Sequence, residues 1–165
     1  MLIGTRTRAS FIGLALTAAL ALAGSANAQA YEWSPQQTVT RLTGTLVFSP
    51  SHGAPFQCKV VLNFRTGNVK RGEDSLPQVF GGAVKGRGCE SVQLVDLPWY
   101  VGPVDPNNVS VSPFGWNGGI ESCVAVDGSK FQVMSDGTWV LGGYYPVCLT
   151  GSLTSNPPVT IVPRP

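Results

Sequence analysis

Apolar residues occupy every second position from Cys58 to Phe64, and mostly polar residues fill the positions between them. Successive side chains of a β-strand point to opposite faces, so this period predicts a strand with one buried face. Leu42, Leu46 and Phe48 show the same period and lie on the same side as Gly44. They predict a second strand of this kind.

Similar short segments, separated by turn residues, follow along the rest of the chain. The segments predicted to be strands are Thr38–Phe48, Cys58–Phe64, Val79–Val84, Ser91–Leu97, Val109–Val111, Ser122–Val126, Lys130–Met134, Thr138–Leu141, Val147–Leu153 and, as an edge strand, Val159–Val162. The segments Arg65–Pro77, Gly102–Asn108 and Phe114–Gly119 are predicted to be loops, and Asp127-Gly128 and Asp136-Gly137 predict turns. The fold class that follows is all-β: a single antiparallel β-sandwich, immunoglobulin-like or jelly-roll-like.

A different hydrophobic pattern occupies the N-terminus. Arg6 and Arg8 precede an uncharged apolar run, Phe11–Ala23, and Ala26-Asn27-Ala28 is a small-x-small cleavage signal. Together they predict a secretory signal peptide over residues 1–28. An uncleaved membrane anchor is disfavoured, because the apolar run is shorter than the roughly 20 residues that span a bilayer. We therefore expect an exported chain, in the periplasm or outside the cell, with no transmembrane segment after cleavage.

Cleavage would leave 165 − 28 = 137 residues, which suits one domain. Residues 29–37 are polar and contain a proline, so we expect a flexible N-terminal arm. Residues 38–162 are predicted to form the sandwich, and residues 163–165 a short tail.

The charge of the chain changes when the leader is set aside. Removing Arg6 and Arg8 takes Lys and Arg from 11 to 9, against 9 Asp and Glu, so the net charge falls to about zero. No stripe of basic residues is visible along the sequence, which argues against nucleic acid and acidic polymers as partners. Charged residues make up 12% of the chain, against about 25% in ordinary soluble domains. Such a weakly charged protein suits an interface or an assembly.

Four cysteines, Cys58, Cys89, Cys123 and Cys148, all follow the predicted leader. Four cysteines in an exported chain favour two disulfides. The alternative is a metal site, but the chain has no Cys-x-x-Cys pair, and zinc ligands usually come in close pairs. Three connectivities are open. We favour Cys58–Cys148 with Cys89–Cys123, a nested pattern that closes a long loop and ties early strands to late ones.

Residues that carry catalysis are scarce. His52 is the single histidine and sits in a turn-like segment, and no Gly-x-Ser-x-Gly elbow is present. Carboxylates are few and dispersed, and the segments around Asp127 and Asp136 lack the ligand ladder of a calcium loop. We therefore expect no enzymatic activity, no cofactor and no metal site.

Aromatic residues are the remaining candidates for function. Trp99 and Tyr100 follow Pro98, and Trp116 lies in a Gly-rich segment. Exposed on loops, they would form a surface that contacts lipid or sugar. Buried, they would plug the ends of the sandwich, and we favour this second interpretation because Trp is mostly buried in folded proteins.

An ordered set of short segments runs from about Thr38 to Val162 and invites comparison with a known family. The segments are Leu42-Thr43-Gly44-Thr45-Leu46, the strand around Cys58, Gly88-Cys89 followed by Leu97-Pro98-Trp99, Cys123, Cys148-Leu149-Thr150-Gly151-Ser152-Leu153 and Pro157-Pro158-Val159-Thr160. This set resembles the Pra-type (PraB-like) activators of alkane oxidation, which are small exported bacterial proteins.

The resemblance implies a secreted, non-enzymatic protein that promotes uptake or emulsification of long-chain hydrocarbons, with hydrocarbon or lipid surfaces as partners. The alternative is a structural or adhesive subunit of an extracellular assembly, such as a fibre or biofilm component. In that case the N-terminal arm would self-associate by adding to the sheet edge of a neighbour. A secreted hydrolase ranks last, because the catalytic groups are missing.

Overall fold

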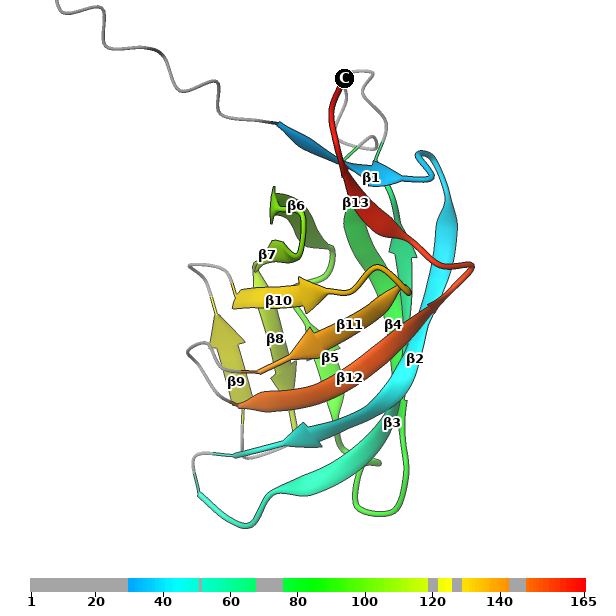
Figure 1. The fold of residues 1–165 in the computed structure, drawn as a ribbon. Coiled ribbons are helices and arrows are strands. Elements are labelled where there is room, and N and C mark those ends of the chain that lie inside the picture. The colour runs from blue at the N-terminus through cyan, green and yellow to red at the C-terminus, as the bar shows by residue number, and fades with distance from the viewer. Residues whose placement is uncertain (1–29, 51, 68–75, 119–121, 126–128, 143–147) are drawn as a thin grey trace, which may run out of the picture.

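The computed structural model describes residues 30–50, 52–67, 76–118, 122–125, 129–142 and 148–165 (Figure 1). The predicted signal peptide, the turn at Asp127-Gly128 and most of the loop predicted over Arg65–Pro77 lie outside them. All regular elements in the described part are β-strands, which confirms the all-β prediction. They are β1 Tyr31–Ser34, β2 Val39–Phe48, β3 Phe56–Arg65, β4 Gln78–Lys85, β5 Gln93–Val95, β6 Trp99–Asp105, β7 Asn108–Ser112, β8 Phe114–Asn117, β9 Ser122–Ala125, β10 Ser129–Val133, β11 Thr138–Leu141, β12 Leu149–Asn156 and β13 Thr160–Pro163.

Eight of these strands form one closed antiparallel barrel in the order β10-β11-β12-β2-β3-β4-β6-β7. The prediction of a β-sandwich is therefore wrong. A sandwich and a filled barrel both place every second side chain in a core, so alternation along a strand does not distinguish them. The difference lies in which strands pair at the edges.

Closure depends on strand β6, in a region predicted as a loop. β6 joins β4 through the pairs Gln78↔Tyr100 and Val79↔Trp99, and it continues along β7 from Tyr100 to Asp105. The prediction of a loop over Gly102–Asn108 is wrong for most of that segment. Gly102, Pro103 and Pro106 read as loop residues in sequence, but a proline is tolerated beside a bulge, and the β6–β7 register shifts between Pro103 and Asp105.

A second sheet, β5-β8-β9, packs against the barrel. Its middle strand β8 falls within the segment Phe114–Gly119, which was also predicted as a loop and is a strand up to Asn117. β8 carries Trp116 against two barrel phenylalanines, with ring centroids 5.2 Å from Phe48 and 6.2 Å from Phe56. Leu94 of β5 approaches Gly82 of β4, where a Cβ atom would lie 2.8 Å from the Leu94 side chain.

The N-terminal segment also differs from its prediction as a flexible arm. Tyr31–Ser34 form β1, which pairs along its length with β13 of the same chain, the strand predicted near the C-terminus (Figure 1). Trp33 of β1 is buried and stacks on Trp139, with ring centroids 5.2 Å apart, and it meets Phe64 edge-on at 4.9 Å. Part of the arm therefore belongs to the core.

One glycine is needed where β2 lies very close to β12. A Cβ atom at Gly44 would collide with the carbonyl oxygen of Ser152 and would lie 3.1 Å from Cα of Leu153. Glycine allows the two backbones to approach this closely, which is a common means of curving a barrel sheet. The predicted inward face holds on either side of it, because Leu42, Leu46 and Phe48 are all buried.

Candidate functional site

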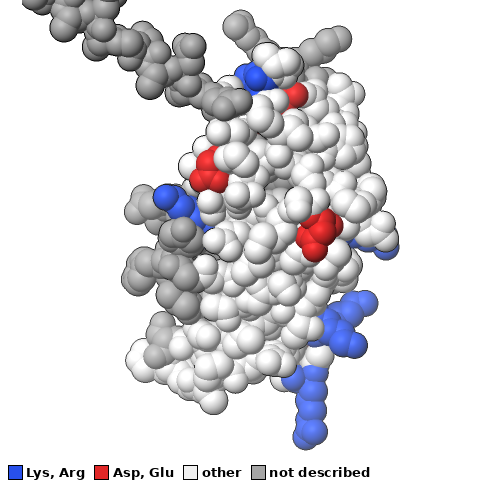
Figure 2. Space-filling model, viewed as in Figure 1, with Lys and Arg blue, Asp and Glu red and all other residues white. Residues whose placement is uncertain are grey.

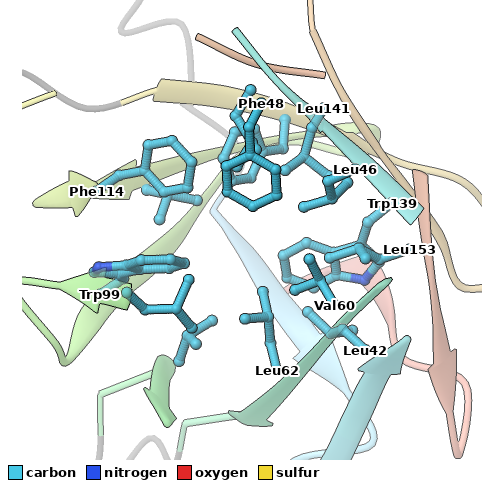
Figure 3. A pocket seen from close by; sticks show the side chains of 15 residues that line it. Leu42, Leu46, Phe48, Val60, Leu62, Trp99, Phe114, Trp139, Leu141 and Leu153 are labelled. Carbon is cyan, nitrogen blue, oxygen red and sulfur yellow. The ribbon is translucent and has the colours of Figure 1, made fainter. Parts of the chain in front are cut away.

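The interior of the barrel is filled with apolar side chains. Figure 3 shows them pointing toward one another, with Trp99 and Phe114 on one side and Trp139, Leu42 and Leu153 on the other. The cavity left between the lining residues is about 10 Å³. A cavity needs about 150 Å³ to hold a benzene molecule, so this interior does not receive a hydrocarbon chain without rearrangement. Apolar side chains that a partner could reach without such rearrangement lie on the outside of the barrel.

Two of the three aromatic candidates belong to the core. Trp99 and Trp116 are 2% and 1% exposed. The Trp99 Nε1–H donates a hydrogen bond to the carbonyl oxygen of Val95 at 2.7 Å, and its ring lies 4.8 Å from that of Phe114. The interpretation of these two residues as core plugs is confirmed, and their alternative role as surface contacts is wrong.

Tyr100 is the candidate that reaches solvent, and β-sheet register places it beside other exposed apolar residues. We call Leu76, Phe80, Tyr100 and Val104 the β4–β6 patch; their exposed fractions are 46, 40, 40 and 48%. Tyr100 pairs with Gln78 of the neighbouring strand β4. Leu76 and Phe80 lie two residues before and two residues after Gln78. Val104 follows Tyr100 on the outer face of β6. The patch is thus continuous across two strands.

Phe80 was not singled out from the sequence, although a signal was available. It follows Val79, and residues of a strand alternate between faces. Once Val79 is assigned to the core, where it is 2% exposed, Phe80 must face outward. The guanidinium carbon of Arg65 lies 5.2 Å from the Phe80 ring centroid, so a cation covers one face of this aromatic residue.

A groove of about 280 Å³ borders the β4–β6 patch. It lies between the β1–β13 ribbon and the barrel, and its lining includes Tyr31, Trp33, Leu76, Pro77, Gly102 and Pro103. Arg164 and Glu32 also line the groove and form an ion pair, with Nε 3.5 Å from Oε2. Leu76 and Gly102 join the groove to the patch.

Two disulfides are present, as predicted, but their pairing differs. Cys58 pairs with Cys89 and Cys123 with Cys148, with Cα–Cα distances of 6.0 and 6.3 Å. The predicted pairing of Cys58 with Cys148 and Cys89 with Cys123 is therefore wrong. A disulfide forms between cysteines that the fold brings together, whereas the prediction considered only the length of the closed loop.

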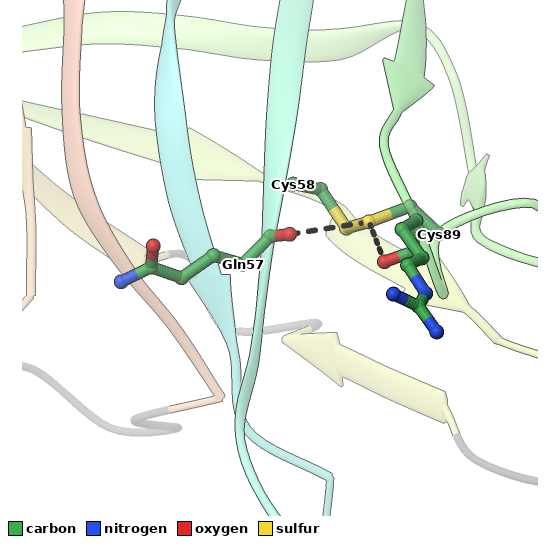
Figure 4. The surroundings of a disulfide bond; sticks show 4 residues. Gln57, Cys58 and Cys89 are labelled. Carbon is green, nitrogen blue, oxygen red and sulfur yellow. Dashed lines mark hydrogen bonds between the residues drawn. A yellow bond between two sulfur atoms is a disulfide. The ribbon is translucent and has the colours of Figure 1, made fainter.

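The Cys58–Cys89 bridge ties the turn after β4 to strand β3. Figure 4 shows Sγ of Cys89 between two carbonyl oxygens, 3.3 Å from that of Gln57 and 3.8 Å from that of Arg87. A disulfide sulfur carries no hydrogen, so these are packing contacts. Cys58 and Cys89 are buried, which indicates a structural role.

Two carboxylates in the described part of the chain, Asp105 and Asp136, have shifted pKa values. Backbone N–H donation from Asn107 and side-chain donation from Asn108 lower the pKa of Asp105 below its ordinary value of 3.8, and backbone donation from Thr138 does the same for the pKa of Asp136. Both carboxylates stabilise turns. In the described part of the chain no three His, Cys, Asp or Glu residues are placed to hold a metal ion. His52 is exposed in the segment before β3.

These features define a class: a disulfide-bonded antiparallel β-barrel whose interior is filled and whose outer surface carries an exposed aromatic patch. The chain belongs to the family described as alkane oxidation protein activator PraA/PraB-like, whose model matches residues 6–163. The resemblance found in the sequence is thus confirmed, and the general kind of protein is an activator of alkane oxidation. No curated protein and no solved structure matches the chain. The described residues hold no helix with the length and apolarity needed to cross a membrane.

Proposed function

We propose that this protein is exported and promotes alkane oxidation without being an enzyme, by adsorbing to long-chain hydrocarbon and helping its uptake or emulsification. The observation that carries the proposal is the β4–β6 patch beside a filled interior. An activator of alkane oxidation that encloses no alkane has to meet it at a surface, and Phe80 and Tyr100 are large apolar groups that already reach solvent.

Adsorption to hexadecane droplets tests this proposal. The full chain is expressed in a bacterial host, the exported protein is purified, and the fraction bound to droplets is measured for wild type and for Phe80→Ser/Tyr100→Ser. We expect the apparent affinity to fall about tenfold, because the variant removes roughly 1.5 kcal/mol of apolar burial at the droplet.

The matched control is Val39→Ser/Met134→Ser, which also removes two exposed apolar side chains but lies outside the patch. It should bind droplets as wild type does. Equal loss in both variants would mean that droplets select apolar surface of any kind, and the β4–β6 patch would lose its special role. Thermal denaturation of all three proteins checks that each one is folded.

A second candidate function is a subunit of an extracellular assembly, and the β1–β13 ribbon favours it. Within the described residues each of these two strands pairs only with the other, so each retains one unpaired edge. Such edges accept a strand from another molecule. Size-exclusion chromatography of the intact exported protein over a range of concentrations tests this: concentration-dependent polymers support the assembly, and a concentration-independent monomer rules it out.

A further inference from the structure

The outer surface of strands β2, β3 and β4 is strongly basic. Its outward residues include Arg41 on β2, Lys59 and Arg65 on β3 and Lys85 on β4, and Arg87 follows in the turn after β4. We call these five residues the basic face. The three strands contain no aspartate or glutamate. In the part of the chain that the structure describes, only Lys130 and Arg164 carry the remaining Lys and Arg charges.

In the part of the chain that the structure describes, carboxylate partners are scarce on the basic face. None of Arg41, Lys59, Lys85 and Arg87 has a carboxylate within ion-pair distance among the described residues. Lys59 and Lys85 lie directly opposite each other on neighbouring strands. Two like charges at such a pair destabilise a sheet. A cost of this kind, together with the lack of ion pairs to these four cations among the described residues, points to a partner that supplies the negative charge.

The sequence conceals this surface. We expected no basic stripe, because the net charge without the leader is about zero. Arg41, Lys59 and Lys85 are also far apart along the chain. Sheet register brings them together: β2 pairs with β3 along ten residues, and β3 pairs with β4 from Lys59 to Arg65. Figure 2 shows several Lys and Arg side chains projecting from the lower right edge of the molecule, where β3 and β4 lie in Figure 1.

We infer that the basic face binds an anionic lipid surface. The charge calls for an anion, and the neighbouring β4–β6 patch distinguishes a lipid surface from a soluble polyanion. Arg65 of the basic face covers Phe80 of the patch, so the basic face and the patch meet at this pair of residues. Lys and Arg beside exposed aromatic side chains are typical of proteins that bind anionic membranes at the interface. An acidic polysaccharide would use the cations alone and would not need the exposed aromatic residue beside them.

Co-sedimentation with lipid vesicles tests the inference on the exported protein. Vesicles of phosphatidylcholine alone are compared with an equimolar mixture of phosphatidylcholine and phosphatidylglycerol. Wild type should bind the anionic vesicles and not the neutral ones, and high salt should release it. Lys59→Gln/Lys85→Gln should bind about 30-fold more weakly, the effect of losing two surface cations near an anionic leaflet.

The charge-matched control is Lys130→Gln/Arg164→Gln, which lowers the net charge equally but leaves the basic face intact. It should keep most of the vesicle binding. Equal losses in the two variants would show a simple net-charge effect and overturn the inference, as would equal wild-type binding to neutral vesicles. Retention on heparin without vesicle binding would assign the face to a soluble polyanion and overturn it also. Relief of the Lys59–Lys85 repulsion should slightly raise the melting temperature of the test variant, so weaker binding would not reflect unfolding.

This inference and the proposed function fail separately. Hexadecane carries no charge, so Lys59→Gln/Lys85→Gln should adsorb to droplets as wild type does even if it has lost the vesicles. If wild type does not adsorb to droplets but still binds anionic vesicles, the inference of lipid binding is supported and the proposed hydrocarbon role is rejected.

Discussion

At the scale of single residues, neighbouring aromatic residues on one strand have opposite roles. Trp99 points inward, where it fills space beside Phe114 and satisfies its N–H with the carbonyl of Val95. Tyr100 points outward and is 40% exposed. The alternation of strand faces therefore places one residue in the core and the next on the exposed surface.

Replacing Trp99 with alanine should lower the free energy of unfolding by about 3–5 kcal/mol, because a large side chain leaves a cavity in a packed core. Replacing Tyr100 with alanine should change it by no more than about 0.5 kcal/mol, as for most surface substitutions. Urea denaturation of the two variants and wild type measures both values. A loss at Tyr100 as large as that at Trp99 would contradict the assignment of faces.

Acid should reveal the role of Asp105, which accepts hydrogen bonds from the Asn107 N–H and from the Asn108 side chain, each at 2.9 Å. These donors favour the ionised form, so the pKa of Asp105 is lower in the folded state than its ordinary value of 3.8. The stability that this carboxylate contributes is then present above pH 3.8 and is lost as the pH falls through the folded pKa. NMR titration of the side-chain carboxyl carbon should give a folded pKa below that of an unfolded peptide, and Asp105→Asn should flatten the acid limb of the stability curve. A folded pKa at or above 3.8 would contradict this account.

At the scale of elements, the close approach of β2 and β12 depends on the missing side chain of Gly44. Gly44→Ala should destabilise the barrel by about 1–3 kcal/mol, because the new Cβ would meet the backbone of Ser152 and the two strands would have to separate. Gly102→Ala is the matched control, since a Cβ at Gly102 would meet no atom within 4 Å. A melting temperature for Gly44→Ala at or above that of Gly102→Ala would show that a side chain at Gly44 is tolerated between the two strands.

Strands with regular alternation could be predicted from sequence, and strands rich in glycine, proline or aromatic residues could not. The predicted segments Thr38–Phe48 and Thr138–Leu141 match β2 and β11 to within one residue at each end. β6 and β8 were missed because Gly102, Pro103 and Gly115 resemble loop residues, although pairing to β7 and β5 holds them in strands. Local pattern records the face of a residue, but long-range pairing decides whether the segment is a strand.

Some of the candidate surface residues could likewise be predicted from the sequence, and others could not. Tyr100 could be named from the sequence as an aromatic residue of unknown exposure, and the structure places it on the surface. The basic face could not be found, because its cations come from three strands with long separations in sequence, and only register makes Lys59 and Lys85 neighbours. A surface built across strands has no signature along any one of them.

At the scale of the whole molecule, the two disulfides secure different parts of the fold. Cys58–Cys89 fixes the β3–β4 side of the barrel, and Cys123–Cys148 joins β9 of the smaller sheet to the residue before β12. Each bridge therefore links two segments that already lie beside each other in the fold. The predicted nested pattern would instead have closed a loop from β3 to the start of β12.

Chemical labelling of single cysteine variants distinguishes the two pairings. In Cys58→Ala the unpaired partner should be Cys89, whereas the nested pattern would leave Cys148 unpaired. Alkylation of the unreduced, denatured protein followed by peptide mass spectrometry identifies which cysteine carries the label. Labelling of Cys148 in place of Cys89 would overturn the observed pairing.

Removing one bridge completely should also have a defined cost. The bridges close sequence separations of 31 and 25 residues, for which the loss of chain entropy in the unfolded state corresponds to about 3.5 kcal/mol each. Cys58→Ala/Cys89→Ala and Cys123→Ala/Cys148→Ala should therefore each lower the free energy of unfolding by roughly 2–4 kcal/mol, and by similar amounts. Because the bridges close separate loops, removing both should approach the sum of the two losses. Urea denaturation of the three variants measures this, and a double loss equal to a single one would mean that the two bridges constrain the same part of the barrel.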